Sequence, residues 1–192
     1  MIRLALLRHG HTSWNRAGRL QGRSDIPLDD MARAELGVLA LPSAWHSADL
    51  VSSPLARAVE TAHLVSGRQP RIEPSLIEMN WGRLEGQHGA ELAKNPDSGF
   101  RHIEDWGWDY CPPEGESPSA LRARLLPWLA NLERDTVAIC HIGTMRVLMA
   151  HATGWMFDGP APFRIKRNRL FVLHVDGQDL TLSPDAERLE RR

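Results

Sequence analysis

The chain has 192 residues, of which 42% are apolar and 24% charged, and its net charge at neutral pH is −1. This composition predicts one globular domain over residues 1–192, and the near-neutral charge argues against nucleic acid or a membrane surface as a partner. Cys111 and Cys140 are too few for a disulfide framework, and no stretch approaches the ~20 apolar residues of a membrane span, so we expect a cytoplasmic location.

In the first half of the chain, two apolar runs at 2–7 and 48–51 are typical of buried parallel strands, because each is nearly continuous and ends abruptly at polar residues. A helix is expected over 29–41. After the second run, Ser53 as N-cap and Pro54 at the first helical position predict another helix, with apolar residues on one face up to Val65.

The second half repeats this alternation. A helix is expected over 118–133, with a kink at Pro127, followed by a buried strand at 136–140 and a buried helix from 145 to 150. The runs 171–175 and 180–182, joined around a turn, predict a closing hairpin.

Strands that alternate with helices predict an α/β fold, a three-layer α/β/α sandwich around a mostly parallel central sheet. Ligands of such sheets bind beyond the carboxyl ends of the strands. Arg8 with His9, Ser53 with Arg57, and His141 all fall just past a predicted strand end, so we expect them to meet in one crevice.

Residues 83–117 are the least regular part of the chain and are rich in Gly and Pro. Their aromatic residues argue against disorder, and we interpret the segment as a lid-like excursion beside the crevice. Trp106 and Trp108 fit lid packing and substrate stacking equally well.

Five sequence blocks, in this order, resemble the signatures of the histidine phosphatase superfamily, the phosphoglycerate-mutase-like proteins of branch 1. The first is Leu7-Arg8-His9-Gly10-His11-Thr12-Ser13-Trp14-Asn15, and the second is Ser53-Pro54-Leu55-Ala56-Arg57-Ala58. The others lie at 76–86, at 113–117 and at His141-Ile142-Gly143-Thr144. The compact length and the opening look most like α-ribazole-5′-phosphate phosphatases and other small bacterial phosphatases.

The resemblance implies that His9 is the nucleophile of a phosphoryl-transfer enzyme and forms a phosphohistidine. The residue types agree with this role, because a neutral imidazole can attack phosphorus and split one hard displacement into two. Arg8 and Arg57 disfavour the imidazolium and can bind phosphoryl oxygens in a bidentate way. His141 is expected to donate a further hydrogen bond to the same group.

Asn15, Gln21 and the backbone near Gly22 are expected to complete the phosphate pocket. Ile142 belongs to the same pocket, although the family usually has a smaller residue there. Glu78 matches the family's general acid, and Glu85 and Glu116 are alternatives nearby. Neither a metal nor another cofactor is implied, since cationic side chains can stabilise the transferring group.

Several residues have simpler interpretations. The basic run Arg164, Lys166, Arg167 and Arg169 is interpreted as a solvated face, with a phosphate-steering rim or a nucleic-acid patch as alternatives. The pair of histidines at 9 and 11 is interpreted as incidental rather than as metal ligands.

The expected partner is a small phosphorylated metabolite. Cofactor-dependent phosphoglycerate mutases carry cations where this chain has Gly89, Gly107 and Trp108. A site without those cations should bind a diphosphorylated acid poorly, so we favour a phosphatase acting on α-ribazole 5′-phosphate or a sugar phosphate. A phosphoglycerate mutase and a non-catalytic phospho-ligand-binding relative remain the alternatives, and a homodimer is left open.

Overall fold

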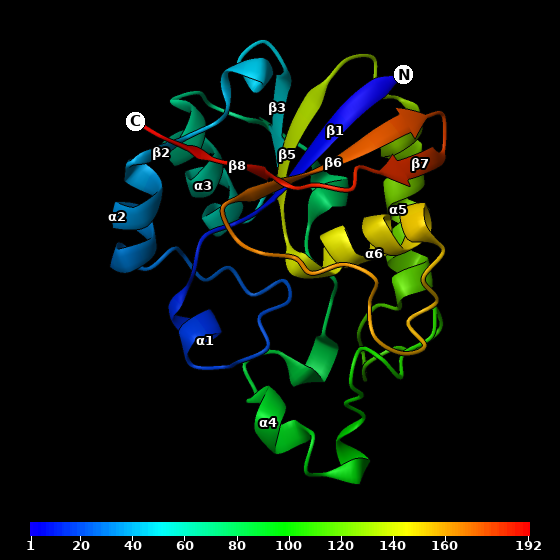
Figure 1. The fold of residues 1–192 in the computed structure, drawn as a ribbon. Helices are drawn as coiled ribbons and strands as arrows, with labels where there is room; N and C mark the ends of the chain where they lie inside the picture. Colours follow the sequence, from blue (N-terminus) through cyan, green and yellow to red (C-terminus); the bar gives the residue numbers. More distant parts are fainter.

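The computed structural model describes residues 1–192 and contains a seven-stranded sheet in the order β4-β3-β5-β1-β6-β7, with β8 beside β6 (Figure 1). The strands are β1 (Ile2–Arg8), β3 (Asp49–Ser52), β4 (Arg71–Ile72), β5 (Thr136–Cys140), β6 (Arg169–Asp176), β7 (Asp179–Leu182) and β8 (Glu187–Arg188). β1, β5, β3 and β4 pair in parallel, whereas β6 pairs antiparallel with β1, β7 and β8. Only β6 therefore runs against the others, and the prediction of a mainly parallel sheet is confirmed.

Helices cover both faces of this sheet, as the alternation predicted. They are α1 (Ser13–Arg16), α2 (Asp30–Gly37), α3 (Ala56–Ser66), α4 (Gly89–Leu92), α5 (Pro118–Ala130) and α6 (Ile142–Thr153). Successive residues of β1 point to opposite faces, so Ala5 and Leu7 pack with α2 and α3, while Leu4 and Leu6 pack with α5 and α6. None of the helices combines the length and the apolar character that a bilayer crossing requires.

The start of α3 differs from the prediction. The helix begins at Ala56, and its N-cap is Leu55, which has no capping side chain. Ser53 is still extended, because its N–H donates to the carbonyl oxygen of Ile139 at 3.0 Å and so continues the strand ladder. The N-cap role assigned to Ser53 was therefore wrong.

Two other helices are shorter than expected. α2 ends at Gly37, because the next residues form β2 (Leu39–Ala40), which pairs with β9 (Glu190–Arg191) near the carboxyl terminus. α5 ends at Ala130, with Pro127 inside it. The predicted hairpin of β6 and β7 and the helix after β5 are confirmed.

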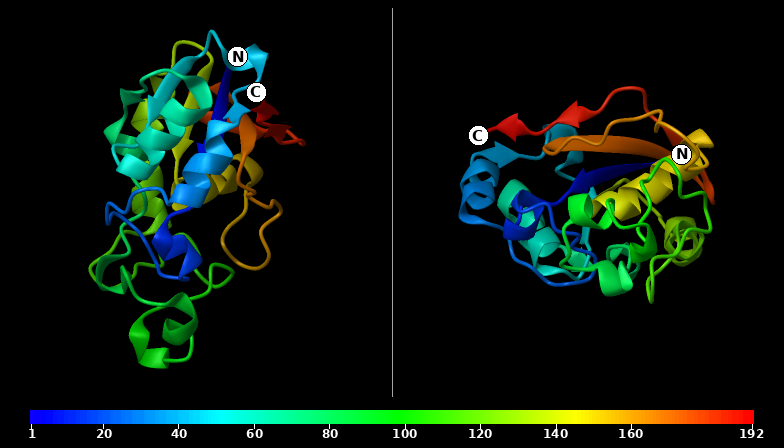
Figure 2. Two further views of the ribbon diagram at one scale, coloured as in Figure 1. Left: turned by 90° about the vertical axis from the view of Figure 1, so that its left-hand side faces the viewer. Right: turned by 90° about the horizontal axis from the view of Figure 1, so that it is seen from below.

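Residues 83–117 form an extension at one end of the molecule, below the carboxyl ends of the parallel strands (Figures 1 and 2). Apart from α4 they contain only single turns of 3₁₀ helix. Trp106 is 5% exposed and stacks against Tyr110 and Phe157, with ring centroids 5.3 and 5.8 Å away. Trp108 contacts Phe157 and donates from Nε1 to the Met156 sulfur. Packing inside the extension and against the segment that follows α6 therefore accounts for both tryptophans, and a lid role for residues 83–117 stays a prediction.

Candidate active site

His9 directly follows β1 and is 3% exposed. Its backbone N–H donates to the carbonyl oxygen of Cys140, which ends the neighbouring β5. On the ring, Nδ1 lies 2.6 Å from the carbonyl oxygen of Gly10. A carbonyl only accepts, so Nδ1 carries the hydrogen and Nε2 keeps its lone pair. The local backbone thus selects the tautomer that a nucleophilic Nε2 requires.

The electrostatic surroundings keep this ring neutral. Burial lowers the pKa of His9 well below its ordinary value, and the neighbouring His141 and three arginines, Arg57, Arg167 and Arg8, lower it further. A neutral imidazole is the form that can attack an electrophile.

His141 is the first residue after β5 and the N-cap of α6. Its ring centroid lies 5.1 Å from that of His9, with the planes tilted by 56°. Nε2 is 2.6 Å from the hydroxyl oxygen of Ser53, whereas the buried Nδ1 has no hydrogen-bond partner. Burial and then Arg57 and Arg8 lower the pKa of His141 well below its ordinary value. Ser53 therefore holds His141 in place, a role that explains why it does not cap α3.

Arg57 projects from the first turn of α3 and is almost completely buried. Its two terminal nitrogens donate to the carbonyl oxygens of Ser24 and Gly22, each at 2.7 Å. The amide of Gln21 lies between this guanidinium and the hydroxyl of Thr12. With its oxygen towards Arg57 it accepts at 2.8 and 3.0 Å, and its nitrogen donates to Thr12. Gln21 and Gly22 therefore position Arg57 in the structure.

Position 22 requires glycine for two reasons. Its φ is +51°, and a Cβ there would lie 1.9 Å from a carboxylate oxygen of Glu85. That carboxylate accepts from the N–H groups of Arg23 and Ser24 at 2.8 and 2.9 Å. Glu85 therefore holds the loop that carries the acceptors of Arg57, which separates it from the general-acid role.

Arg8 ends β1 beside His9. Its Nε is buried and has no hydrogen-bond partner, and burial lowers the pKa of Arg8 to about 10. Two nitrogens of the site, Arg8 Nε and His141 Nδ1, are thus buried without a protein acceptor. Buried polar groups in native proteins nearly always have a partner, so these two nitrogens mark a place where an anionic ligand fits.

Arg167 was interpreted as part of a solvated face, and that interpretation was wrong. Its guanidinium is folded inward and donates to the carbonyl oxygens of His9 and Gly10 and, at 3.1 Å, to Oδ1 of Asn15. Burial and the nearby Arg8 lower the pKa of Arg167 to about 9. Its sequence neighbours give no hint of this, because a run of basic residues usually lies in water.

Asn15 belongs to the short helix α1. Its Oδ1 accepts from the N–H of Thr12 and from Arg167, and the Thr12 hydroxyl accepts from its backbone N–H, which completes a capping box. No protein hydrogen bond uses Nδ2. The capping box fixes the side chain so that this amide nitrogen stays available as a donor.

Glu78 is the acid of the site. It is 5% exposed, and its carboxylate accepts from the N–H groups of Met79, Gly143 and Thr144 at 2.8, 3.1 and 3.2 Å. Gly143 and Thr144 form the first turn of α6, directly after His141, so Glu78 lies at the amino end of that helix. The carboxyl group therefore lies next to the turn of His141, whose ring is beside that of His9.

Arg124 of α5 supports the segment around Glu78. It donates to the carbonyl oxygens of Ile77 and Glu78, at 2.6 and 3.2 Å, and to the carboxylate of Glu116, at 2.8 Å. Glu116 is therefore held in an ion pair on the far side of the Glu78 backbone. Among Glu78, Glu85 and Glu116, only Glu78 contacts the turn that follows His141.

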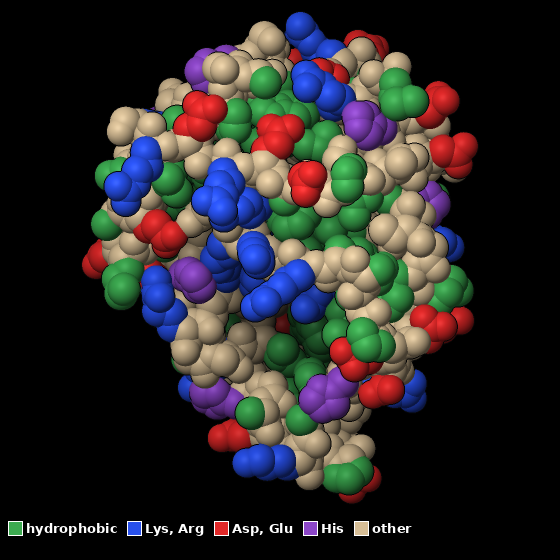
Figure 3. Space-filling view, viewed as in Figure 1, with side chains coloured by type: hydrophobic (Ala, Val, Ile, Leu, Met, Phe, Trp, Pro, Cys, Tyr) green, Lys and Arg blue, Asp and Glu red, His purple; other side chains and the backbone are tan.

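The site is strongly cationic. On the face seen in Figure 1, Lys and Arg side chains gather near the centre, beside a hollow in the surface (Figure 3). Arg8, Arg57 and Arg167 surround the two histidines, whose rings are both neutral. No group of three or more His, Cys, Asp or Glu side chains is arranged to hold a metal ion. A neutral nucleophile, several guanidiniums and one acid suit attack on a phosphoryl group.

The predicted site residues therefore lie together. His9, Arg8, Arg57, Glu78 and His141 form one cluster, with Asn15, Gln21 and Gly22 beside it and Ile142 at the first position of α6. Sequence reasoning missed Arg167. It placed Ser53 with Arg57 and His141 at the strand ends, as the structure confirms, but gave Ser53 an N-cap role instead of the contact with His141.

A buried neutral histidine and its arginines at the carboxyl ends of a mainly parallel sheet suit a phosphoryl-transfer enzyme. A model of the histidine phosphatase superfamily, branch 1, matches residues 4–184. The chain belongs to this superfamily, as its five blocks predicted.

Three similar proteins carry different names. One from Photorhabdus laumondii, "Probable phosphoglycerate mutase GpmB", is 29% identical over 168 residues, covering 79% of this chain and 78% of that protein. The crystal structure of a phosphoglycerate mutase from Thermus thermophilus is 31% identical in sequence and covers 98% of this chain and 100% of its own, with a TM-score of 0.77. A candidate α-ribazole-5′-P phosphatase from Escherichia coli is 25% identical, with 97% and 96% coverage and a TM-score of 0.76.

Proposed function

We propose that the protein is a phosphatase that hydrolyses a small phosphate monoester through a phosphohistidine on His9. The observation that carries this proposal is the state of the ring: Nδ1–H donates to Gly10, so Nε2 keeps its lone pair, and burial with nearby cations holds the ring neutral. The two buried nitrogens without a partner, on Arg8 and His141, support a phosphoryl group as the ligand.

In the first step Nε2 of His9 attacks phosphorus, the N–P bond forms and the P–O bond to the alcohol breaks. Arg8, Arg57 and His141 donate to the phosphoryl oxygens while charge develops on them. Asn15 Nδ2 is a further donor. The alkoxide takes a proton from Glu78, which must carry that proton when the substrate is bound.

In the second step water attacks phosphorus, the N–P bond breaks and inorganic phosphate leaves. Glu78, now ionised, takes a proton from the attacking water and so returns to its starting state. His9 regains its lone pair. Both steps balance without a metal or a redox cofactor, and cofactor independence stays a prediction.

The acceptor of the phosphoryl group distinguishes a phosphatase from a mutase. Gly89 begins α4, and Gly107 and Trp108 lie in the aromatic packing of the extension, where Trp108 contacts Phe157. None of the three supplies the positive charge that a second phosphate and a carboxylate need, which favours water as the acceptor. The mutase names among the relatives make the mutase the second candidate.

The substrate we infer is a small phosphorylated metabolite such as α-ribazole 5′-phosphate or a sugar phosphate, consumed in the cytoplasm. Both cysteines are unpaired, which agrees with that compartment. The deciding experiment measures phosphate release from a panel of monoesters, alongside interconversion of 3- and 2-phosphoglycerate with bisphosphoglycerate present. Phosphate release alone supports the phosphatase, and efficient interconversion would overturn it.

A second measurement separates either enzyme from a phospho-ligand-binding relative. Wild-type protein given radioactive substrate should acquire an acid-labile, alkali-stable label. His9→Ala should lose both this label and the turnover of p-nitrophenyl phosphate, whereas His11→Ala, two residues further along the chain, should keep both. A label that persists in His9→Ala would place the nucleophile elsewhere.

A further inference from the structure

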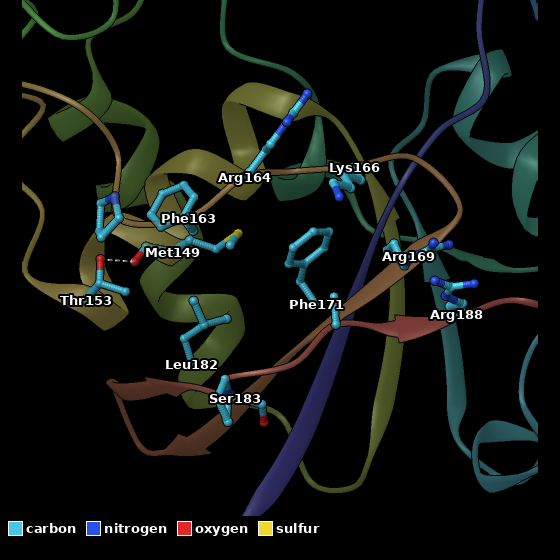
Figure 4. Close-up of a pocket in the computed structure, with 13 residues that line it drawn as sticks. Met149, Thr153, Phe163, Arg164, Lys166, Arg169, Phe171, Leu182, Ser183 and Arg188 are labelled. Atoms are coloured by element: carbon cyan, nitrogen blue, oxygen red, sulfur yellow. Dashed lines mark hydrogen bonds between the residues drawn. The ribbon is translucent and has the colours of Figure 1, made fainter.

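A second cationic pocket lies on the other side of the chain segment that carries Arg167. Its volume is about 630 Å³, within the range of small-molecule sites. In Figure 4, Lys166, Arg169 and Arg188 lie along one side of this pocket, and Arg164 lies at its rim with its guanidinium turned outward. They come from the connection between α6 and β6, from β6 itself and from β8. None of the pocket-lining residues is acidic.

The charges of these four residues have no internal partner. None of them forms an ion pair, and the side chain of Arg169 alone makes a protein hydrogen bond, to the carbonyl oxygen of Asn168 at 3.0 Å. The acid next to Arg188, Glu187, accepts instead from the indole N–H of Trp45 at 2.7 Å. The whole chain has 23 basic and 24 acidic residues, so its charges nearly cancel. Around this pocket they do not, because four basic residues line it and no acidic residue does.

The opposite side of the pocket is mostly apolar, although Thr153 and Ser183 also line it. Phe171 lies at its centre in Figure 4. Met149 of α6, Leu182 of β7 and Phe163 of the connection between α6 and β6 lie on the side away from the cations. A ligand that fits both sides has an anionic group for the guanidiniums and a flat apolar body for the phenylalanine rings. A free inorganic anion would leave the apolar side uncovered.

We propose that this pocket is a second binding site, separate from the catalytic one, for a small aromatic molecule that carries a phosphate group. Lys166, Arg169 and Arg188 bind the phosphate, and Phe171 and Phe163 pack against the ring. Arg167 points from the same segment into the catalytic site, so this segment forms a wall between two anion sites. The proposal goes beyond the hydrolysis assigned to His9 and does not depend on it.

The chain offers a sharp chemical test, because its two lysines are Lys166 in the pocket and Lys94 after α4. Pyridoxal 5′-phosphate is an aromatic phosphate whose aldehyde condenses with amines, and borohydride makes the adduct permanent. Peptide mass spectrometry then reports both lysines from one sample. Lys94, which is exposed, is the internal reference.

We expect pyridoxal 5′-phosphate to label Lys166 about fivefold more than Lys94, and pyridoxal, which lacks the phosphate, to label both equally. Arg188→Gln should lower the ratio about threefold, whereas Arg191→Gln, an exposed arginine of β9 outside the pocket, should leave it unchanged. Equal labelling by the two reagents, or a ratio insensitive to Arg188→Gln, would overturn the proposal.

His9→Ala separates this proposal from the proposed function. That variant loses hydrolysis but should label Lys166 as the wild type does. If the selective labelling of Lys166 disappears in His9→Ala, the reagent was held by the catalytic site, and the second site is wrong. Loss of hydrolysis with labelling intact supports both proposals.

Discussion

Arg167 donates a hydrogen bond to the backbone carbonyl oxygen of His9, although 158 residues separate the two in the chain. The same guanidinium reaches the carbonyl of Gly10 and the side chain of Asn15. Gly10 also accepts from the His9 ring. One cation therefore joins the segment before β6 to the turn that sets the orientation and tautomer of the His9 ring.

Replacing Arg167 by Ala should lower kcat/KM for p-nitrophenyl phosphate about 10- to 100-fold, because three acceptors lose a charged donor and the phosphate site loses a cation. We expect kcat to fall as well as affinity, since the His9 turn is loosened. Arg167→Lys keeps the charge but not the forked geometry and should recover only part of the rate. Arg191→Gln is the control, and wild-type kinetics in Arg167→Ala would refute the role.

Glu78→Gln should affect substrates according to their leaving group. A poor leaving group such as the alcohol of glycerol phosphate needs a proton, whereas p-nitrophenolate leaves without one. We expect hydrolysis of glycerol phosphate to fall about 100- to 1,000-fold and that of p-nitrophenyl phosphate much less. Steady-state kinetics on both substrates test whether Glu78 protonates the leaving group. Equal losses on the two would remove Glu78 from proton transfer.

Gly143→Ala tests the position of Glu78 without changing its chemistry. A Cβ at Gly143 would lie 2.3 Å from a carboxylate oxygen of Glu78, so the carboxyl group must move. The variant should therefore show the same leaving-group dependence as Glu78→Gln. At Gly37, in the last position of α2, an added Cβ meets no atom within 4 Å, so Gly37→Ala should keep full activity. Full activity in both variants would contradict the placement of Glu78.

The two buried histidines predict how stability depends on pH. Their folded-state pKa values lie well below the ordinary value of 6.5, so below that pH the unfolded chain binds protons that the folded chain does not. The free energy of unfolding should be nearly flat between about pH 7 and pH 8 and fall on acidification, by up to about 1.4 kcal/mol per pH unit for each histidine.

Urea unfolding between pH 7.5 and pH 5 measures this slope. His9→Asn removes one of the two strongly shifted groups and should lower the loss in that window by somewhat less than half, because burial also lowers the pKa of His11. Asp29 and Asp135 have lowered pKa values and contribute only at more acidic pH, because a carboxylate with a lowered pKa loses its stabilisation below its unfolded value. A stability that rises on acidification from pH 6.5 would contradict the burial of neutral histidines.

Much of the fold follows from local patterns. The continuous apolar runs that became β1, β3 and β5 identify buried parallel strands, since both faces of such strands are covered. The predicted positions of the helix ends were less accurate. The pairing of β2 with β9, which shortens α2, joins segments about 150 residues apart and has no local sequence signal.

The sequence by itself determined the class of enzyme, because His9, Arg57, Glu78 and His141 follow strand ends or lie in motifs whose residue types carry the chemistry. The tertiary structure decided how these groups are held: Ser53 against His141, three backbone N–H groups on Glu78, and Arg167 folded inward rather than solvated. Residue type is local information, whereas burial and the partner of a charge depend on segments that only folding brings together.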